Sequence, residues 1–415
     1  MIAAATEQTS RTGLSSRDQI GALVTGADYR GLGVVRSLGR RGIPVWVLRR
    51  AGHRLAAASR YARNSTPWPA GTEAQGVEFL LDLANRQGLK GWVLVPTDDE
   101  VVNLVARHHG ALSKQFCLTV QPWEQLRWAC DKRLLNNLAQ DLRIDQPWTV
   151  CPRNREEVAR LACTFPVILK PALREEFNPL TVAKAWRVDD RESLLERYDE
   201  ACSMMSPDLI MVQEVIPGWG EAQFSYAAVC RNGRSIASLV ARRTRQYPMD
   251  FGQFSTFVET IDDPGVVEPS VRLLEAARFT GLVEVEFKRD PRDGRFKVLD
   301  VNPRVWGWHT LGSRVGVDFT HLLWQMVRGE AVPETHPKAK ASWIRLNTDL
   351  PVAMLEIARR RLSLPDFLRS FRNPIESAVF AADDPLPGIL EMPVLAYFFC
   401  KRIFNRRRRA KCTRR

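Results

Sequence analysis

The chain has 415 residues, of which 45% are hydrophobic and 26% are charged, values close to the average for globular proteins. This length is too great for one ordinary core and predicts two or three packed lobes. The formal net charge of +13 is concentrated in residues 401–415, which hold nine Lys or Arg and no acid. Removing these nine charges from +13 leaves +4, so the bulk of the chain lacks the strongly basic character of a nucleic-acid-binding fold.

The ends of the sequence and its cysteines exclude further classes. The first 18 residues are small and polar, and we expect a disordered start rather than a signal peptide. No stretch approaches the roughly 18 to 20 apolar residues that a membrane-spanning helix needs. The eight cysteines are scattered, without a CxxC pair or zinc-ligand spacing, which favours reduced thiols and a cytoplasmic location.

The first predicted elements alternate between strand and helix. Residues 20–50 are expected to form a strand, a glycine-rich turn, a short helix and a second strand, and a helix and a strand follow over residues 74–96. This alternation is typical of a parallel sheet with helices on both faces. The turn glycines do not fit the GxGxxG dinucleotide fingerprint. At the end of the last strand Asp98 is expected to cap a helix; the alternative is that it holds a cationic amine together with Glu100.

From Asp131 onward the pattern changes. Residues 131–142 predict an amphipathic helix, residues 147–151 an edge segment, and residues 165–172 a short apolar strand that ends in Lys-Pro. Two alternating strands flank Asn232–Gly233, a strong hairpin signal. No internal repeat is visible in the sequence.

The most informative stretch is residues 281–304. Glu284 and Glu286 alternate with apolar residues and share one strand face, and Asp300 and Asn302 share a face of the next strand. A hairpin register that pairs Glu286 with Asp300 also pairs Glu284 with Asn302. Four oxygen-bearing side chains would then gather on one surface, as Mg²⁺ requires. The alternative is an ordinary solvated hairpin face.

Here the sequence resembles the ATP-grasp superfamily, and the resemblance covers roughly residues 20–330. The segments VEVEF and LDVNPR match the family's two metal-binding strands in order and spacing. The resemblance implies that Glu286, Asp300 and Asn302 bind Mg²⁺ or Mn²⁺, with Asp300 in place of the more usual Glu. It also implies that Arg304 stabilises charge on an acyl phosphate.

The resemblance also implies an ATP site. Lys132 and Lys170 match the lysines that contact the nucleotide phosphates. The segment MVQEVIPGWGE matches the hinge that holds adenine and ribose, and the residues implied there are Gln213, Glu214, Ile216 and Glu221. The glycine-rich lid of many members is replaced by residues 171–185, where Arg174, Thr181 or Lys184 would contribute.

Arginines precede an aromatic segment at residues 241–257. The position of this segment resembles the region where family members meet the triphosphate and the acceptor, which implies a catalytic role for Arg245 beside Lys170 and Arg304. Arg243 and Arg245 are expected to share one face, because alternate residues of a strand do so. The alternative is a solvated strand face.

The resemblance implies a mixed α/β and α+β architecture. The domains expected are a disordered start (1–18), a Rossmann-like domain (19–125), a two-lobed ATP-grasp domain (126–335), a C-terminal extension (336–400) and a basic tail (401–415). The implied activity is that of a stand-alone carboxylate–amine ligase, a group that includes D-aspartate ligases, acting on ATP, a small carboxylate and an amine.

Two other functions stay open from the sequence. One is a non-catalytic ATP-binding regulatory protein near the membrane. The other is non-specific nucleic-acid binding through the basic tail. Because apolar and aromatic residues precede the basic tail, a peripheral position on the anionic inner face of the membrane is slightly favoured over nucleic acid.

Overall fold

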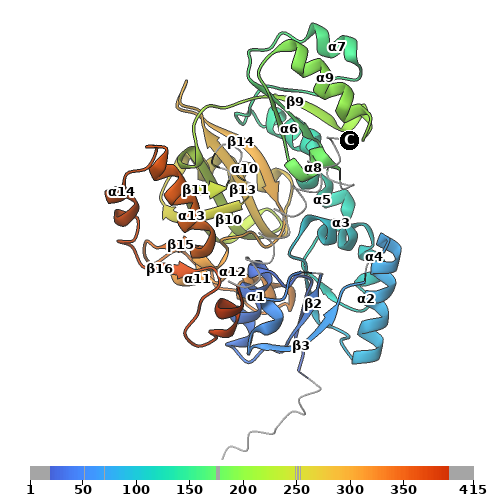
Figure 1. Ribbon diagram of the computed structural model, residues 1–415. Helices are drawn as coiled ribbons and strands as arrows, with labels where there is room; N and C mark the ends of the chain where they lie inside the picture. The colour runs from blue at the N-terminus through green and yellow to red at the C-terminus, as the bar shows by residue number, and fades with distance from the viewer. Residues whose placement is uncertain are drawn as a thin grey trace, which may run out of the picture.

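The structure is a computed structural model that describes residues 19–391, except residues 51, 70, 174–177, 248, 250, 251 and 253. Three of the sequence predictions lie outside the described residues. These are the disordered start, the contribution of Arg174 to the lid, and the basic tail 401–415. The described chain forms three sheets, each with its own helices (Figure 1).

The first sheet is parallel, as predicted, with the strand order β3-β2-β1-β4-β5. Its strands are β1 (Ala22–Val24), β2 (Val45–Arg49), β3 (Ala62–Pro67), β4 (Val93–Val95) and β5 (Cys117–Leu118). The accompanying helices are α1 (Tyr29–Gly39), α2 (Glu73–Gln87), α3 (Asp99–Arg107), α4 (His109–Leu112) and α5 (Trp123–Cys130). The predicted helix cap is confirmed, because Asp98 accepts a hydrogen bond from the Val101 N–H at 3.0 Å.

Helix α1 begins earlier than the sequence predicted. Asp28 caps it by accepting a hydrogen bond from the Arg30 N–H at 2.9 Å, so the expected turn is already helical from Tyr29. A Cβ on Gly31 would lie only 2.0 Å from the carbonyl oxygen of Gly26. This glycine therefore permits close packing of the helix on the turn, rather than forming the turn itself.

The second sheet has four antiparallel strands in the order β6-β9-β7-β8. Its strands are β6 (Thr149–Val150), β7 (Val167–Pro171), β8 (Trp186–Val188) and β9 (Ile210–Glu214). The predicted edge segment is confirmed as β6. The nearby helices are α6 (Lys132–Asp141), α7 (Arg155–Arg160), α8 (Pro179–Ala183) and α9 (Arg191–Cys202). This small sheet has a separate apolar core, to which Leu169, Leu194 and Tyr198 contribute.

The third sheet has seven strands in the order β14-β13-β10-β11-β12-β15-β16. They are β10 (Gln223–Arg231), β11 (Arg234–Tyr247), β12 (Phe254–Ile261), β13 (Gly281–Arg289), β14 (Phe296–Asn302), β15 (Ser342–Ile344) and β16 (Ile375–Ser377). The predicted hairpin at Asn232–Gly233 is confirmed, and both residues have positive φ, 50° and 85°. Its helices are α10 (Pro264–Ala276), α11 (Thr310–Arg314), α12 (Phe319–Val327), α13 (Leu346–Ala358) and α14 (Leu364–Arg369).

Both faces of this large sheet are buried near its middle. Tyr226 and Ala228 belong to the core that includes α10, whereas Ala227 and Val229 belong to the core that includes α12. This alternation is the two-residue period of a strand. The core on the α10 side continues into α2, α3, α5 and α6. The first domain is therefore packed against the large sheet rather than tethered to it.

The residues after the seven-stranded sheet fold back onto the first domain. Arg36 on α1 donates to Asp384 at 2.9 Å and to the carbonyl oxygen of Val379 at 2.7 Å. Arg40, one turn later, pairs with Asp383 at 2.7 Å. Among the described residues, no helix combines the length and the apolar character needed to cross a bilayer.

Candidate active site

The acidic hairpin formed by β13 and β14 has the register that the sequence predicted. Glu286 lies opposite Asp300, and Glu284 lies opposite Asn302. The pairing shifts by one residue directly after Glu286, so a bulge separates the acidic end of the hairpin from the rest of it. The four oxygen-bearing side chains therefore share one face.

The acidic hairpin is bound by cations from other elements. Lys132, the first residue of α6, lies 2.6 Å from Asp300. Arg243 on β11 bridges the two glutamates, with its Nη2 2.8 Å from Glu284 Oε1 and 2.7 Å from Glu286 Oε1. This face of the sheet is thus arranged to hold positive charge against three carboxylates.

Asn302 and Glu284 fix the geometry of the hairpin. The Asn302 amide donates to Glu284 at 3.1 Å and to Glu286 at 2.6 Å. Glu284 is buried and also accepts from Ser225 and from the indole of Trp308, each at 3.0 Å. Burial raises the pKa of Glu284, and the charge of Arg243 opposes this rise. Glu284 therefore positions its neighbours, whereas Glu286 and Asp300 face an open cleft.

This cleft, which we call the intersheet cleft, lies between the small and large sheets. It brings together most of the residues that the resemblance implied for ATP and metal. Lys170, at the end of β7, lines it together with Lys184 from the lid segment. The other predicted residues along its walls are Lys132, Gln213, Glu214, Ile216, Glu286 and Asp300.

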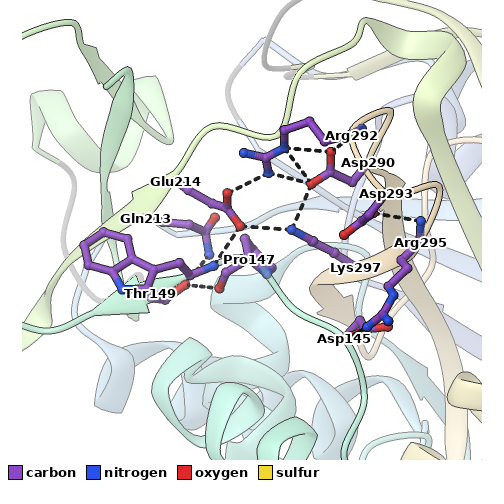
Figure 2. Close-up of polar contacts among 11 residues, drawn as sticks. Asp145, Pro147, Thr149, Gln213, Glu214, Asp290, Arg292, Asp293, Arg295 and Lys297 are labelled. Carbon is purple, nitrogen blue, oxygen red and sulfur yellow. Dashed lines mark hydrogen bonds and ion pairs between the residues drawn. The ribbon is translucent and has the colours of Figure 1, made fainter. Parts of the chain in front are cut away.

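Glu214 belongs to an ionic network that joins the two sheets (Figure 2). Its carboxylate accepts from Lys297 at 3.1 Å, from Arg292 at 2.6 Å and from the Trp148 N–H at 3.0 Å. Lys297 also pairs with Asp290, which is fully buried, at 2.8 Å. Burial alone would raise the pKa of Glu214, but the hydrogen bonds outweigh it and hold the pKa below its ordinary value.

Arg304 links the acidic hairpin to the first domain. It donates to the amide oxygen of Asn302 at 3.0 Å and pairs with Asp99 at the start of α3. This contact places the carboxyl edge of the first sheet beside the acidic hairpin. A smaller cavity next to Asp300 is lined by Lys132, Asp99 and Asn302, so the two domains meet at this point.

A separate cavity of about 440 Å³ lies at the carboxyl edge of the parallel sheet. Gly26 after β1 and Asp98 after β4 both line it, at the point where the strand order reverses. Arg50 spans the cavity wall, 2.7 Å from Glu100 and 3.9 Å from Asp98. Open α/β sheets bind ligands at this position, so the cavity is a candidate substrate site.

The structure does not bring Arg245 to the acidic hairpin, which corrects the prediction that Arg243 and Arg245 share a face. The pairing of β11 with β12 is irregular between residues 242 and 246, so the simple alternation fails. Arg245 is buried against Asp349 at 2.8 Å and lies over the ring of Phe257. Its contacts are those of a structural ion pair.

Glu221 is also not brought to the intersheet cleft. It lies exposed in a short helical turn, Gly220–Ala222, where its carboxylate accepts from the Trp219 N–H at 3.3 Å. Lys288 does line the cleft, and its ammonium donates to the carbonyl oxygen of Gly218, two residues before this turn, at 2.7 Å.

Sequence reasoning missed several residues of the site. Asp290 and Lys297 belong to no motif: Lys297 pairs with Glu214, which lies on a different sheet far away in the sequence, and Asp290 joins the network through Lys297. Asp98 and Glu100 were predicted to have roles at this strand end, but Asp99 between them was not. The sequence did point to Arg243, because it predicted a shared role for Arg243 and Arg245. It could not show that only Arg243 contacts the glutamates, because that depends on the irregular pairing of β11 with β12.

The donor set of the acidic hairpin fits a hard divalent cation. Glu286, Asp300 and Asn302 offer only oxygen ligands, which Mg²⁺ prefers. In the described part of the chain, no three Asp, Glu, His or Cys side chains converge into a complete metal cage. A cation here would therefore need further oxygens, such as those of nucleotide phosphates.

Comparison with known proteins points to one group of relatives. No protein-family model matches the chain. Among curated proteins it is similar to the D-aspartate ligase of Enterococcus faecium, with 22% identity over 245 residues that cover 55% of this chain and 57% of that protein. It is also similar to the carbamoyl phosphate synthase large chain of Methanobrevibacter smithii, with 24% identity over 157 residues that cover 36% of this chain and 14% of that protein. The chain thus spans less than two thirds of the length of each.

Solved structures resemble the chain over most of its length. The L-amino acid ligase from Bacillus licheniformis has a TM-score of 0.61 at 16% identity, covering 78% of this chain and 79% of that chain. The N5-carboxyaminoimidazole synthetase from Staphylococcus aureus has a TM-score of 0.61 at 14% identity, covering 83% of this chain and 87% of that chain. The chain has the ATP-grasp fold. The fold predicted from the sequence is therefore confirmed.

A third similar ATP-grasp structure is the biotin carboxylase domain of 2-oxoglutarate carboxylase from Hydrogenobacter thermophilus. Its TM-score is 0.61 at 14% identity, covering 77% of this chain and 72% of that chain, and it was solved with MgADP. The small and large sheets of the present chain are the two lobes of its ATP-grasp fold, with the intersheet cleft between them.

Proposed function

We propose that this chain is an ATP-dependent carboxylate–amine ligase that forms an amide through an acyl phosphate and releases ADP and phosphate. The observation that carries the proposal is the placement of Glu286 and Asp300 in one cleft with Lys132 and Lys170. Paired carboxylates and lysines from both lobes are suited to a metal-bound triphosphate. The similarity to ATP-grasp ligases supports the same activity.

In this proposal the hinge holds the adenosine and the lysines hold the phosphates. Ile216 is buried beside the cleft and offers an apolar wall for the base. The side chains of Gln213 and Glu214 already have protein partners, Thr149 and the ionic network, so base recognition falls to the backbone of this segment. Lys132 and Lys170 neutralise the phosphates, and Lys132 exchanges its contact with Asp300 for the nucleotide.

Glu286, Asp300 and Asn302 would hold Mg²⁺ or Mn²⁺ together with the nucleotide phosphates. When bound, such an ion neutralises charge on the phosphates during transfer. Arg243 and Glu284 hold the glutamate and amide side chains in place for this role. The chain itself contributes positioning and charge neutralisation rather than a covalent intermediate.

The reaction divides into two steps. A carboxylate oxygen of the substrate attacks the γ-phosphorus, the bond to the bridging oxygen breaks, and ADP leaves. The amine nitrogen of the second substrate then attacks the acyl carbon, inorganic phosphate leaves, and the nitrogen loses a proton. Arg304, held between Asn302 and Asp99, is placed to stabilise the charge on the acyl phosphate.

We assign the cavity at the carboxyl edge of the first sheet to the organic substrates. It neighbours Asp99, which also borders the cavity beside Asp300, so a small molecule bound there lies close to the acidic hairpin. Its lining mixes guanidinium groups, such as Arg30 and Arg50, with carboxylates. Such a lining suits small acids and amines, the substrates expected of this fold.

Phosphate release measured over a matrix of small acids and amines, with ATP and Mg²⁺, tests the proposal. We expect release that depends on both an acid and an amine, with the amide and ADP formed in equal amounts. Asp300→Asn and Lys170→Met should each lower turnover at least about a hundredfold. The matched control is Asp293→Asn, in the exposed turn of the hairpin. Tight ATP binding without turnover for any pair would contradict the ligase assignment.

A further inference from the structure

The C-terminal extension exposes an apolar surface on the outside of the molecule. Of the fourteen large hydrophobic side chains that are exposed among the described residues, ten lie between Leu346 and Leu390. On α13, Leu346, Leu350 and Met354 recur every four residues and form one stripe. On α14, Leu364 and Leu368 do the same. An apolar surface of this kind marks an interaction site.

The stripe on α13 is not the side that packs on the sheet. Val352 and Ala353 are buried where α13 packs against β11 and β12. Met354, one residue further along, is 63% exposed. The helix is therefore apolar on two sides, one covered by the sheet and one uncovered. We call the uncovered side, together with the exposed leucines of α14, the α13–α14 face.

The exposed charges of residues 346–372, the segment that carries most of the α13–α14 face, are mostly positive, and Arg359, Arg361 and Arg369 among them pair with acids of the same segment. The two acids of α13, Asp349 and Glu356, are buried and paired with arginines. Asp366 on α14 is the one acid among the exposed charges of residues 346–372. The exposed cations of the same segment are Arg359, Arg360, Arg361, Arg369 and Arg372. An apolar face with a cationic rim complements a surface that is apolar inside and anionic outside.

The sequence that follows the described residues is also apolar and basic. Residues 392–400 are all apolar, and residues 401–415 hold nine Lys or Arg and no acid. The described chain ends at Glu391, which is tied to the start of α13 by Arg345 at 2.9 Å and Asn347 at 2.7 Å. The described chain thus ends beside the start of α13, where the stripe begins.

We propose that the α13–α14 face docks on the surface of an anionic lipid bilayer, with its leucines in the boundary region and its arginines among the headgroups. Each basic residue near such a surface adds to the attraction, and the apolar side chains supply insertion. A nucleic acid offers no partner for the leucine stripes. A symmetric second copy would set arginine rims of like charge against each other.

Sedimentation of the full chain with vesicles tests this proposal. The vesicles contain phosphatidylcholine alone or phosphatidylcholine mixed with phosphatidylglycerol. We expect binding to the mixed vesicles only. The double variant Leu364→Glu/Leu368→Glu should weaken this binding by about tenfold or more, since two apolar side chains no longer insert.

The matched control is Lys90→Glu, which changes the net charge by the same two units. Lys90 is exposed just after α2, and Figure 1 shows α2 and α14 at opposite sides of the molecule. This variant should bind the mixed vesicles within about twofold of the unaltered chain, because charge near the bilayer decides attraction.

Four results would overturn the proposal. The first is that the unaltered chain sediments with neither kind of vesicle. The second is that the double variant binds like the unaltered chain while deletion of residues 392–415 abolishes binding, which assigns docking to that segment alone. The third is that the chain is a dimer that the double variant separates, which makes the face an interface between copies. The fourth is that amides of α13–α14 lose hydrogen-exchange protection on deletion of residues 392–415 without vesicles, which makes that segment the cover of the face.

Discussion

Glu214 on β9 and Lys297 on β14 form an ion pair of 3.1 Å between the two lobes of the ATP-grasp fold. The pair ties the hinge segment to the acidic hairpin, since Lys297 lies three residues before Asp300 on the same strand. Asp290 accepts from Arg292 and Lys297, and these hydrogen bonds hold the pKa of Asp290 well below its usual range. The segment around Glu214 and the strand that carries Asp300 are therefore positioned by one network.

Replacing Lys297 with Met tests this coupling. The variant loses one of the two ion pairs that Glu214 forms with the other lobe, while Arg292 continues to bind both acids. We expect the free energy of unfolding to fall by about 2 kcal/mol, and the Kd for ATP to rise about tenfold. Arg295→Met is the control, because Arg295 is an exposed residue just before β14, two positions from Lys297, and forms only a surface ion pair with Asp145. Unfolding curves and calorimetric titration with ATP measure the two effects. A stability loss with unchanged ATP affinity would leave the network a purely structural feature.

Arg243 and Arg245 are expected to give opposite phenotypes. Arg243→Met leaves Glu284 and Glu286 without their shared cation, so turnover should fall at least about a hundredfold. Arg245→Met leaves Asp349 buried without its cation, so the free energy of unfolding should fall by about 3 kcal/mol while kcat for the folded fraction is retained.

Arg243→Lys distinguishes charge from geometry in this pair of tests. A lysine supplies one cation but not the fork that spans two carboxylates, so we expect partial recovery of kcat. Denaturant curves and turnover at a temperature where all variants are folded give both readouts. Loss of kcat in the folded Arg245→Met protein would restore the catalytic role that the sequence suggested.

His309 predicts a pH-dependent loss of stability. The imidazole is buried, its Nδ1–H donates a hydrogen bond to the carbonyl oxygen of Trp306 at 2.9 Å, and it interacts with the charges of Asp318, Asp28 and Arg30. Burial lowers the pKa of His309 from 6.5 to about 4. As the pH falls below 6.5, His309 becomes protonated in the unfolded chain, whereas in the folded chain it becomes protonated only near pH 4. The folded state therefore loses about 3 kcal/mol across this window.

The variant His309→Asn isolates this contribution. Asparagine retains a donor for the carbonyl oxygen of Trp306 and does not titrate. We expect the free energy of unfolding of the variant to fall less steeply between pH 6.5 and pH 4 than that of the unaltered chain. Equal slopes in denaturant titrations over this range would show that His309 takes up its proton in the folded protein.

The acidic hairpin could be predicted because the residues that form it lie close together in the sequence. A turn joins β13 directly to β14, so the alternation of Glu284 and Glu286 with apolar residues fixes which side chains share a face. The sequence also indicated the parallel sheet, but it missed β3, whose residues ARNSTP are mostly polar. Strand β3 lies at the sheet edge, where an apolar pattern is not required.

The contacts that the sequence did not predict depend on irregular strand pairing or join residues that are far apart in the sequence. The disturbed pairing of β11 with β12 separates Arg243 from Arg245, and no sequence pattern marks it. The partners of Glu214 lie on another sheet, and Arg304 finds Asp99 about two hundred residues away. Such contacts follow from the packing of complete domains, which local periodicity does not encode.

The central claim, that oxygen ligands of the acidic hairpin hold a divalent cation against a lysine-bound nucleotide, is tested most directly with Mn²⁺ as a spectroscopic probe. Mn²⁺ binding is measured by electron paramagnetic resonance with a non-hydrolysable ATP analogue, for the unaltered chain, Glu286→Gln and Asp300→Asn. We expect tight binding only in the presence of the nucleotide, weakened by at least about tenfold in both variants. Equal nucleotide-dependent binding in all three proteins would contradict the account.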